Sequence, residues 1–189
     1  MKKSSSSSLH ETTLSTESIF KGKVISLQVD TVQLPDGNQA TREVVKHPGA
    51  VAVLAVYEGR LLLVDQYRQP MGRCELEIPA GKLEKDENPM EAAKRELQEE
   101  TGYTCGKIEP LHSFYTSPGF ADEIIHLYIA FDLQKGDMSL DEDEFLEVYE
   151  ATLEECEAYI VEGRIADAKT ILAVYAWKQG LLDKEDKGL

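Results

Sequence analysis

Short apolar runs separated by turn residues dominate the first two thirds of the chain. Residues 50–56 (AVAVLAV) are wholly apolar, residues 61–68 (LLLVDQYR) begin with an apolar run, and residues 74–80 (CELEIPA) alternate. Runs of this length between turn signals are typical of strands, and the intervening YEGR predicts a hairpin between the first two. Residues 108–117 and 123–133 have the same character and predict two further strands, and residues 145–151 become strand-like after an acidic start.

An earlier β-like segment precedes these strands. Between residues 20 and 46, apolar residues recur at short spacing around the turn sequence PDGN at residues 35–38. His47-Pro48-Gly49 then interrupts the pattern. We therefore expect a flexible tail over residues 1–16, a small antiparallel β domain over residues 17–47, and a main domain over residues 48–189.

Three segments carry helix signals. Asn88 is a favoured N-cap, Pro89 suits the first helical position, and Gly102 is a stop signal. Thr152 and Glu155 form a capping-box pattern before an apolar run, and residues 167–180 form a last amphipathic segment. Strands interspersed with three helices predict a mixed α/β sandwich, with helices covering the sheet.

The first of these helices has an unusual distribution of acidic residues. At about 100° per residue, Glu96, Glu99 and Glu100 fall on one arc beside the apolar face, whereas the other polar residues lie opposite. Arg95 can pair with Glu99 or Glu91, but one arginine cannot neutralise all the acids. Carboxylates at the edge of a core are costly unless they are paired or bind metal. A hard divalent cation such as Mg²⁺ would explain them, and a solvated helix with paired charges is the competing interpretation.

Overall charge and cysteine content narrow the function classes. The 189 residues include 20 Lys and Arg against 35 Asp and Glu, a formal charge of −15, which disfavours nucleic acid and anionic membranes as partners. The three cysteines are scattered, without the spacing of a disulfide framework or a zinc site, and favour a reduced, cytoplasmic protein. The start, MKKSSSSS, lacks the apolar core of a secretion signal, and no apolar run reaches the roughly 20 residues of a membrane span.

Residues 81–103 resemble the signature of the Nudix hydrolase family. The pattern is Gly, five residues, Glu, seven residues, Arg-Glu, an aliphatic residue, any residue, Glu-Glu, any residue, Gly and an aliphatic residue. Its positions here are Gly81, Glu87, Arg95, Glu96, Leu97, Glu99, Glu100, Gly102 and Tyr103. Tyr103 alone departs from it, being aromatic at a position that packs rather than reacts.

The resemblance implies a Nudix-type α/β/α sandwich and a set of functional residues. Glu96, Glu99 and Glu100 would bind Mg²⁺, with Mn²⁺ as an alternative, and the carbonyl of Ala80 would be a further ligand. Glu87 would help indirectly, and Arg95 would orient the glutamates by ion pairing. The chemistry of the family is hydrolysis of a nucleoside diphosphate linked to another group.

A proline sixteen residues beyond Gly102 points to the ADP-ribose pyrophosphatase subfamily. Alone, Ser117-Pro118-Gly119 would be an ordinary turn between strands. With the signature beside it, the resemblance implies a substrate-binding loop, with Glu123 near the terminal ribose. The expected reaction is hydrolysis of ADP-ribose to AMP and ribose 5-phosphate.

Other implied roles lie outside the signature. In the acidic stretch at residues 140–145, Glu142 would be the general base and Glu144 a metal contact, although Asp143 could shift this register. Arg68 would contact the diphosphate, with a surface arginine as the plainer interpretation. Phe20, Arg42 and Glu43 would belong to a unit that is exchanged between two subunits and contributes to the pocket, which implies a homodimer.

Two other functions stay open. The chain could be a Nudix hydrolase of another nucleoside diphosphate sugar or of an oxidised nucleotide. It could also be a non-catalytic nucleotide sensor on the same fold, although the complete set of signature residues favours an enzyme.

Overall fold

The computed structural model describes residues 9–140 and 145–182. Its contacts divide the chain into two units. The small unit comprises Met1–Gly49 together with Tyr115–Ile124, and the large unit comprises Ala50–Phe114 together with Ile125–Leu189.

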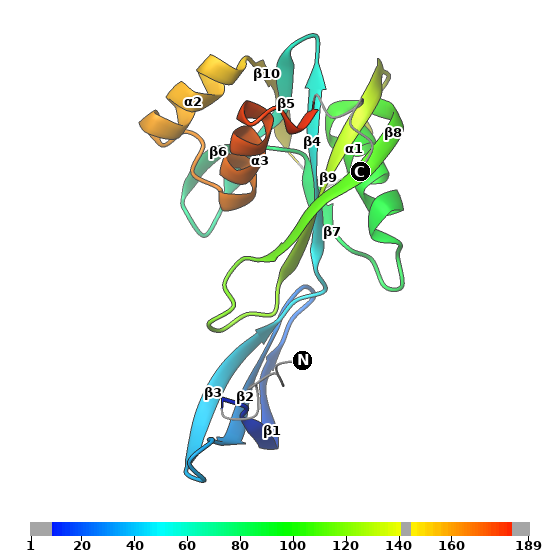
Figure 1. The fold of residues 1–189 in the computed structure, drawn as a ribbon. Helices are drawn as coiled ribbons and strands as arrows, with labels where there is room; N and C mark the ends of the chain where they lie inside the picture. Colours follow the sequence, from blue (N-terminus) through cyan, green and yellow to red (C-terminus); the bar gives the residue numbers. More distant parts are fainter. Residues whose placement is uncertain (1–8, 141–144, 183–189) are drawn as a thin grey trace, which may run out of the picture. The chain divides into compact units, whose positions relative to one another are not determined.

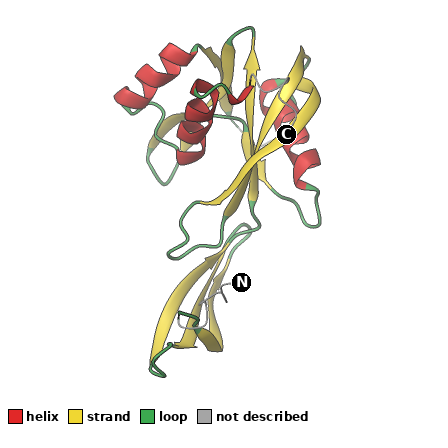
Figure 2. Ribbon diagram, in the orientation of Figure 1, coloured by secondary structure: helices red, strands yellow, loops and turns green. Residues whose placement is uncertain are grey.

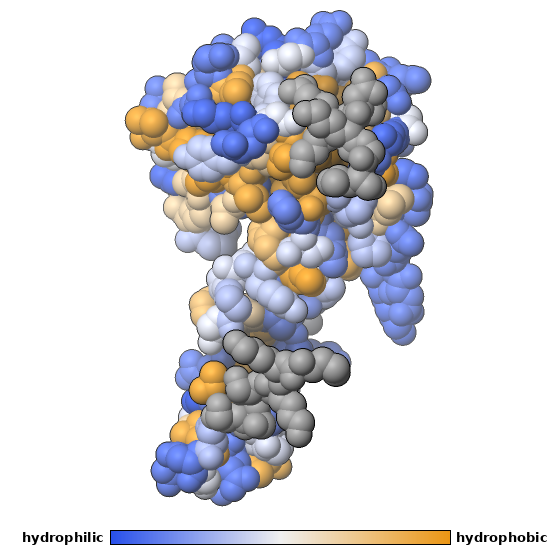
Figure 3. Space-filling view, in the orientation of Figure 1, coloured by the Kyte–Doolittle hydropathy of each residue, from blue (hydrophilic) through white to orange (hydrophobic). Residues whose placement is uncertain are grey.

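The small unit is a three-stranded antiparallel sheet in the order β1-β2-β3, formed by Thr12–Lys21, Ser26–Gln33 and Gln39–Lys46. The turn between β2 and β3 contains Gly37 at φ 88°, in the left-handed region that favours glycine. The segment 117–121 joins the unit through a hydrogen bond from the Val45 amide to the Phe120 carbonyl, at 2.7 Å. Figure 3 shows hydrophobic residues on the visible surface of this unit.

The predicted tail over residues 1–16 is wrong at its end, because β1 begins at Thr12. All ten residues of this strand are exposed, so neither face of it is buried, and the alternation that a buried face imposes on a sequence is not required here. Pairing with β2 along its length supplies the backbone hydrogen bonds instead.

A mixed sheet forms the centre of the large unit. Within the described residues it has seven strands, with the path β10-β5-β4-β9-β8, while β6 pairs with β5 and β7 with β4. β4 and β9 are parallel, and the pairings of β4 with β5, β5 with β10, β5 with β6 and β4 with β7 are antiparallel. The strands are Ala50–Tyr57 (β4), Arg60–Arg68 (β5), Arg73–Glu77 (β6), Ala80–Lys82 (β7), Tyr103–Tyr115 (β8), Ile124–Lys135 (β9) and Leu146–Ala151 (β10).

Residues 74–80 do not form the single strand that their alternation predicts. β6 ends at Glu77, and the chain resumes as β7 at Ala80 on a different neighbour. Pro79 separates the two strands, and a proline has no amide hydrogen with which to continue a ladder. Its carbonyl accepts a hydrogen bond from Val53 of β4, at 2.9 Å, where the chain changes neighbours.

Three helices cover the two faces of the sheet in this described part of the chain. Figures 1 and 2 show α1 (Pro89–Thr101) on one side and α2 (Leu153–Glu162) with α3 (Ala168–Lys178) on the other. Alternate residues of β4 supply the two cores, because successive side chains of a strand point to opposite faces. Ala52 and Leu54 pack in the cluster that includes α2 and α3, whereas Val51 and Val53 pack in the cluster that includes α1. The predicted α/β/α sandwich is confirmed.

The predicted boundaries of α1 and the predicted start of α2 are confirmed by their caps, whereas α3 ends at Lys178, before the predicted end at Gly180. The Asn88 side chain accepts a hydrogen bond from the Met90 amide at 2.9 Å, and Gly102 ends α1 at φ 76°. Thr152 and Glu155 form both bonds of a capping box at the start of α2. None of the helices in residues 9–140 and 145–182 is long and apolar enough to cross a membrane.

Candidate active site on the glutamate-rich helix

Arg95 gathers three carboxylates at the edge of α1. Its Nε and Nη2 donate to the two oxygens of Glu87, at 3.0 and 3.1 Å. Its Nη1 donates to Glu96 at 2.9 Å and to Glu99 at 2.8 Å. The alternative pairing with Glu91 does not form, because Lys94 takes that carboxylate. Arg95 therefore holds Glu87, from the loop before the helix, against two acids of the helix itself.

The ion pairs of this cluster shift the titration of its members. Hydrogen bonds to Glu87 and Glu99, with the charge of Glu96, raise the pKa of Arg95 above its ordinary value despite partial burial. The hydrogen bonds from Arg95 in turn lower the pKa of Glu87. Both groups are therefore charged at neutral pH.

Glu100 lies deeper, where the helix meets β7. Only 1% of the residue is exposed, and its Oε2 accepts a hydrogen bond from the Ala80 amide at 2.9 Å. Glu96 is 7% exposed, so both acids lie on the buried edge that the helical periodicity predicts. A solvated acidic helix would expose them, and that interpretation is wrong for this pair.

Gly81 supplies the space for the Glu96 carboxylate. A Cβ atom on Gly81 would lie 1.9 Å from Oε1 of Glu96 and 2.0 Å from its carboxyl carbon. Contacts this short do not occur between real atoms, so the carboxylate fills the volume that any other residue at position 81 would occupy. Gly81, the first glycine of the signature, and Glu96, its first helical glutamate, are thus sterically coupled.

The negative charge of this region exceeds its positive charge. Glu87, Glu96 and Glu99 share the single guanidinium of Arg95, and Glu100 lies beside them on the helix. Among the described residues no three His, Cys, Asp or Glu side chains converge as a ready-made metal site. The available donors are carboxylate oxygens next to a backbone strand, and oxygen ligands are those that Mg²⁺ prefers. The absence of a side chain at Gly81 leaves room for one of these carboxylates, that of Glu96. The residues therefore fit a hard divalent cation.

Arg68 lies at the end of β5 and is held by a buried acid. Its Nε and Nη2 donate to the two oxygens of Glu77, at 2.6 and 2.8 Å. Lys169 of α3 donates to Oε2 of the same carboxylate. Sequence reasoning placed Arg68 near the diphosphate but missed Glu77 and Lys169. The alternation of residues 74–77 gave no signal for Glu77, because it groups this residue with Glu75 on the polar face, opposite Leu76, although the structure buries all three.

Phe20, Arg42 and Glu43 belong to the small unit. Phe20 is 54% exposed at the end of β1, which leaves its ring accessible. Arg42 and Glu43 lie on β3, where Arg42 pairs with Glu11, its Nε donating at 3.0 Å. The roles of these three residues in substrate binding stay predictions.

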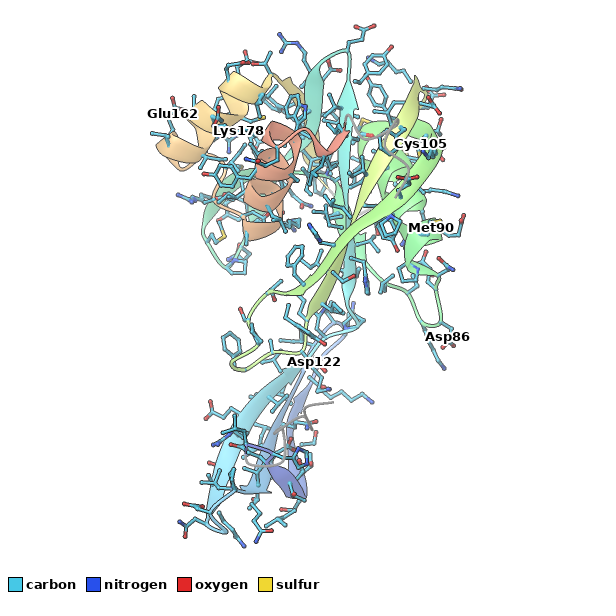
Figure 4. The ribbon with its side chains drawn as sticks, in the orientation of Figure 1. Asp86, Met90, Cys105, Asp122, Glu162 and Lys178 are labelled. Carbon is cyan, nitrogen blue, oxygen red and sulfur yellow. The ribbon has the colours of Figure 1, made fainter. Side chains whose placement is uncertain are left out.

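The segment around Pro118 forms a compact turn in the same unit. The amides of Phe120 and Ala121 donate to the Ser117 carbonyl at 3.0 and 2.9 Å, and Gly119 lies within the turn. Glu123 accepts a hydrogen bond from Thr116 at 2.6 Å and has an oxygen 3.6 Å from Nε2 of His47. Figure 4 labels Asp122, beside this turn.

Glu142 and Glu144, predicted as base and metal contact, lie outside the described residues. The segment that leads toward them is described as far as Leu140 and lies against α1. The Ser139 amide donates to the Glu99 carbonyl at 3.1 Å, and the Gly136 amide donates to the Gly102 carbonyl at 2.7 Å. Residues 136–139 therefore lie along the C-terminal end of the glutamate-rich helix.

With this geometry established, comparison with known proteins defines the class. The sequence matches the NUDIX domain over residues 45–172, and residues 11–45 match the nucleoside diphosphate sugar hydrolase N-terminal domain. The chain belongs to the Nudix family.

Similar proteins cover most of the chain. It is 54% identical over 170 residues to the ADP-ribose pyrophosphatase of Bacillus subtilis (strain 168), covering 88% of this chain and 92% of that protein. It is 56% identical over 167 residues to the methanol dehydrogenase activator of Bacillus methanolicus, covering 87% and 90%. A crystal structure of an ADP compounds hydrolase superposes with a TM-score of 0.82 over 95% of this chain and 99% of the other, at 20% identity, which shows a shared fold.

Proposed function

We propose that this Nudix protein hydrolyses the diphosphate bond of ADP-ribose and releases AMP and ribose 5-phosphate. The observation that carries the proposal is the gathering of the signature glutamates around Arg95 at the buried edge of α1, beside β7. The choice of ADP-ribose is supported by the relative of that name at 54% identity and by the proline turn at residues 117–121.

Glu96, Glu99 and Glu100, with the carbonyl of Ala80, would hold Mg²⁺, or Mn²⁺ as an alternative. When bound, such an ion offsets phosphoryl charge and lowers the pKa of a coordinated water. The chain's own contribution is to keep acidic oxygens in place where charge repulsion would separate them. Arg95 does this by binding Glu87, Glu96 and Glu99 at once, because the planar guanidinium has donors on several sides.

Other residues would bind substrate and move the proton. Arg68 would contact the diphosphate, Glu142 would take the proton from the attacking water, and Glu144 would contact the metal. Diphosphate hydrolysis depends on charge neutralisation and on alignment of the water, so each role answers a requirement of the reaction. In the small unit, the residues with proposed substrate contacts are Phe20, Arg42, Glu43, Ser117, Pro118, Gly119 and Glu123.

We further propose that residues 17–47 act as a dimerisation domain ahead of the hydrolase domain at residues 48–189. The sheet β1-β2-β3 has little core of its own, with Val32 its one buried hydrophobic residue in the described part of the chain. Leu14, Ile19 and Phe20 of β1 are exposed instead. Small isolated sheets are marginally stable, so pairing with a second copy would bury this surface.

The unpaired cysteines support a reducing, cytoplasmic environment.

GDP-mannose is a second candidate substrate, which the name of one relative suggests. The GDP-mannose pyrophosphatase of Yersinia enterocolitica is 38% identical over 168 residues, covering 80% of this chain and 87% of that protein. Turnover of ADP-ribose, GDP-mannose and other nucleoside diphosphate sugars in parallel with Mg²⁺ separates the two. A GDP-mannose rate well above that of ADP-ribose would replace the proposed substrate.

Product analysis in ¹⁸O-labelled water tests the reaction itself. We expect AMP and ribose 5-phosphate, with label on one of them, and no product when EDTA is present. Glu99→Gln and Glu100→Gln should abolish turnover while the protein stays folded. Glu91→Gln is the matched control, because this glutamate is on the same helix but exposed and paired with Lys94. Full activity in Glu99→Gln or Glu100→Gln would remove the metal-ligand assignment.

A further inference from the structure

The carboxylate of Glu77 lies between two cations in the large unit. Its side chain is only 4% exposed, and Arg68 and Lys169 both donate to it. Burial alone would raise the pKa of this acid, but hydrogen bonds from Arg68 and the charge of Lys169 lower it below its ordinary value. Asp167 adds a fourth charge, because Lys169 also lies 3.0 Å from its Oδ2. The result is a row of alternating charges, Arg68–Glu77–Lys169–Asp167.

The backbone holds Lys169 in this place independently of its charge. Along β6, the Leu76 amide donates to the Arg164 carbonyl at 3.1 Å, and the Glu75 carboxylate accepts from the Ala166 amide at 3.1 Å. The next contact is from the Ile78 amide to Thr170 Oγ1 at 3.0 Å. The start of α3 is thus attached along the strand that leads to Ala80 and the signature.

Arg68 is the most exposed member of the charged row, ahead of Asp167 at 24%. Side-chain exposure is 37% for Arg68, against 8% for Lys169. Glu77 engages Nε and Nη2 of Arg68, and in the described part of the chain Nη1 makes no hydrogen bond. Hydrogen bonding to Glu77 raises the pKa of Arg68. Glu77 lies three residues before Ala80, whose amide donates to Glu100 at 2.9 Å, so the strand that holds Arg68 leads directly to the glutamate-rich helix.

We propose that Lys169 is a positioning residue for the diphosphate. By pairing with Glu77, it offsets part of the charge of that carboxylate, so that Arg68 stays oriented and keeps positive charge available for a phosphate group. The proposal deepens the proposed function and rests on it for the contact between Arg68 and the diphosphate. No feature of the signature involves Lys169, which lies 67 residues after Gly102.

The physical reason is that Oε2 of Glu77 is shared. It accepts from Nη2 of Arg68 and from Nζ of Lys169 together. Arg68 and Glu77 are a bidentate pair already, and with Lys169 and Asp167 the four charges sum to zero. Without the lysine, Arg68 alone faces the two acids, so the row gains negative charge and attracts an anion less. The buried carboxylate still keeps one cation, so the variant should fold.

A double-mutant cycle between Arg68 and Lys169 tests this. The variants are Lys169→Met, Arg68→Met and the double variant, each measured for kcat and KM on ADP-ribose and for the Kd of ADP with Mg²⁺ by calorimetry. We expect Lys169→Met to weaken ADP binding and raise KM about tenfold in the parent background, and less than twofold when Arg68 is already methionine. Lys169→Arg should restore most of the loss.

Lys178→Met is the matched control. Lys178 lies at the other end of α3 (Figure 4) and pairs with Glu157 of α2, so its loss should leave kcat, KM and Kd unchanged. Thermal unfolding of every variant separates folding from positioning. A Lys169→Met effect of equal size in both backgrounds, or no effect, would overturn the inference.

Failure of the proposed function gives a different result. If the parent protein turns over no ADP-ribose, the proposed substrate falls, while the cycle on the Kd of ADP still reports the coupling between Arg68 and Lys169. If the parent protein binds no ADP, the inference is overturned with it.

Discussion

The Glu96 carboxylate occupies the space that a side chain at Gly81 would need, with Oε1 only 1.9 Å from the position of an added Cβ. Gly81 lies on β7 and Glu96 on α1, so the relationship ties the strand before the signature loop to the helix after it. Because the other neighbours of Glu96 include Arg95, a shift of this carboxylate would also disturb the ion pairs that Arg95 makes.

The first prediction follows from this steric coupling. Gly81→Ala should displace the Glu96 carboxylate and lower kcat/KM about 100-fold, comparable to the loss of a group that orients a metal ligand. Activity assays with saturating Mg²⁺, together with circular dichroism to show retained structure, measure it. Lys82→Ala, at the next and exposed position, should have little effect. Wild-type kcat/KM in Gly81→Ala would show that the carboxylate can be relocated without consequence.

Arg95 should not be replaceable by lysine. A lysine is a single point charge and cannot bridge Glu87 with Glu96 and Glu99 as the guanidinium does. We expect Arg95→Lys to lower kcat/KM about 10- to 100-fold, measured on the same substrate. Lys94→Gln, which removes a neighbouring cation paired with exposed Glu91, serves as the control. Equal activity in Arg95→Lys and the parent protein would contradict the orienting role.

Divalent metal should stabilise the folded protein through the buried acids. At a Mg²⁺ concentration 100 times the Kd, binding to the folded state alone raises the free energy of unfolding by about 2.7 kcal/mol. Thermal unfolding across a Mg²⁺ titration should show this rise, and EDTA should reverse it. Glu100→Gln should abolish the rise while retaining the Ala80 hydrogen bond, because the amide oxygen can still accept it. An unchanged Mg²⁺ response in this variant would exclude Glu100 as a ligand.

The buried hydroxyl of Tyr103 should make the free energy of unfolding fall at alkaline pH. Burial, with the hydrogen bond to Glu150 at 3.1 Å, raises the pKa of its hydroxyl from 10.0 to about 12. Because the unfolded chain releases this proton from about pH 10 while the folded protein retains it, the stabilisation is complete below pH 10 and is lost as the pH rises toward 12.

Denaturant unfolding between pH 9 and about 11.5 measures this effect, which should be on the order of 1–2 kcal/mol. Tyr103→Phe should remove that part of the pH dependence, whereas Tyr175→Phe, at an exposed position, should not. Parallel stability curves for Tyr103→Phe and the parent protein would contradict the prediction.

The proposed dimer is testable at β1. Ile19→Asp places a charge on an exposed apolar position and should shift sedimentation at micromolar concentration from dimer to monomer. Ser18→Asp, on the same exposed strand, adds the same charge at a polar position and should leave the dimer intact. A parent protein that sediments as a monomer would remove the dimer from the proposed function.

Local signals in the sequence determined much of this molecule. Caps at Asn88, Gly102 and Thr152 bounded the helices, and the 3.6-residue period placed Glu96 and Glu100 at the core edge, because a helix terminus and a helix face depend on neighbouring residues alone. The start of strand β1 was not predicted, because a strand that is exposed on both faces needs no alternation of apolar and polar residues.

Tertiary structure decided the contacts between distant segments. The division of residues 74–80 between two neighbours, the Glu96 carboxylate in the Gly81 cradle, and the attachment of Lys169 to Glu77 across 92 residues all depend on which surfaces the sheet brings together. A buried charge gains its partner from the fold as a whole, and no periodicity along the chain records which partner that will be.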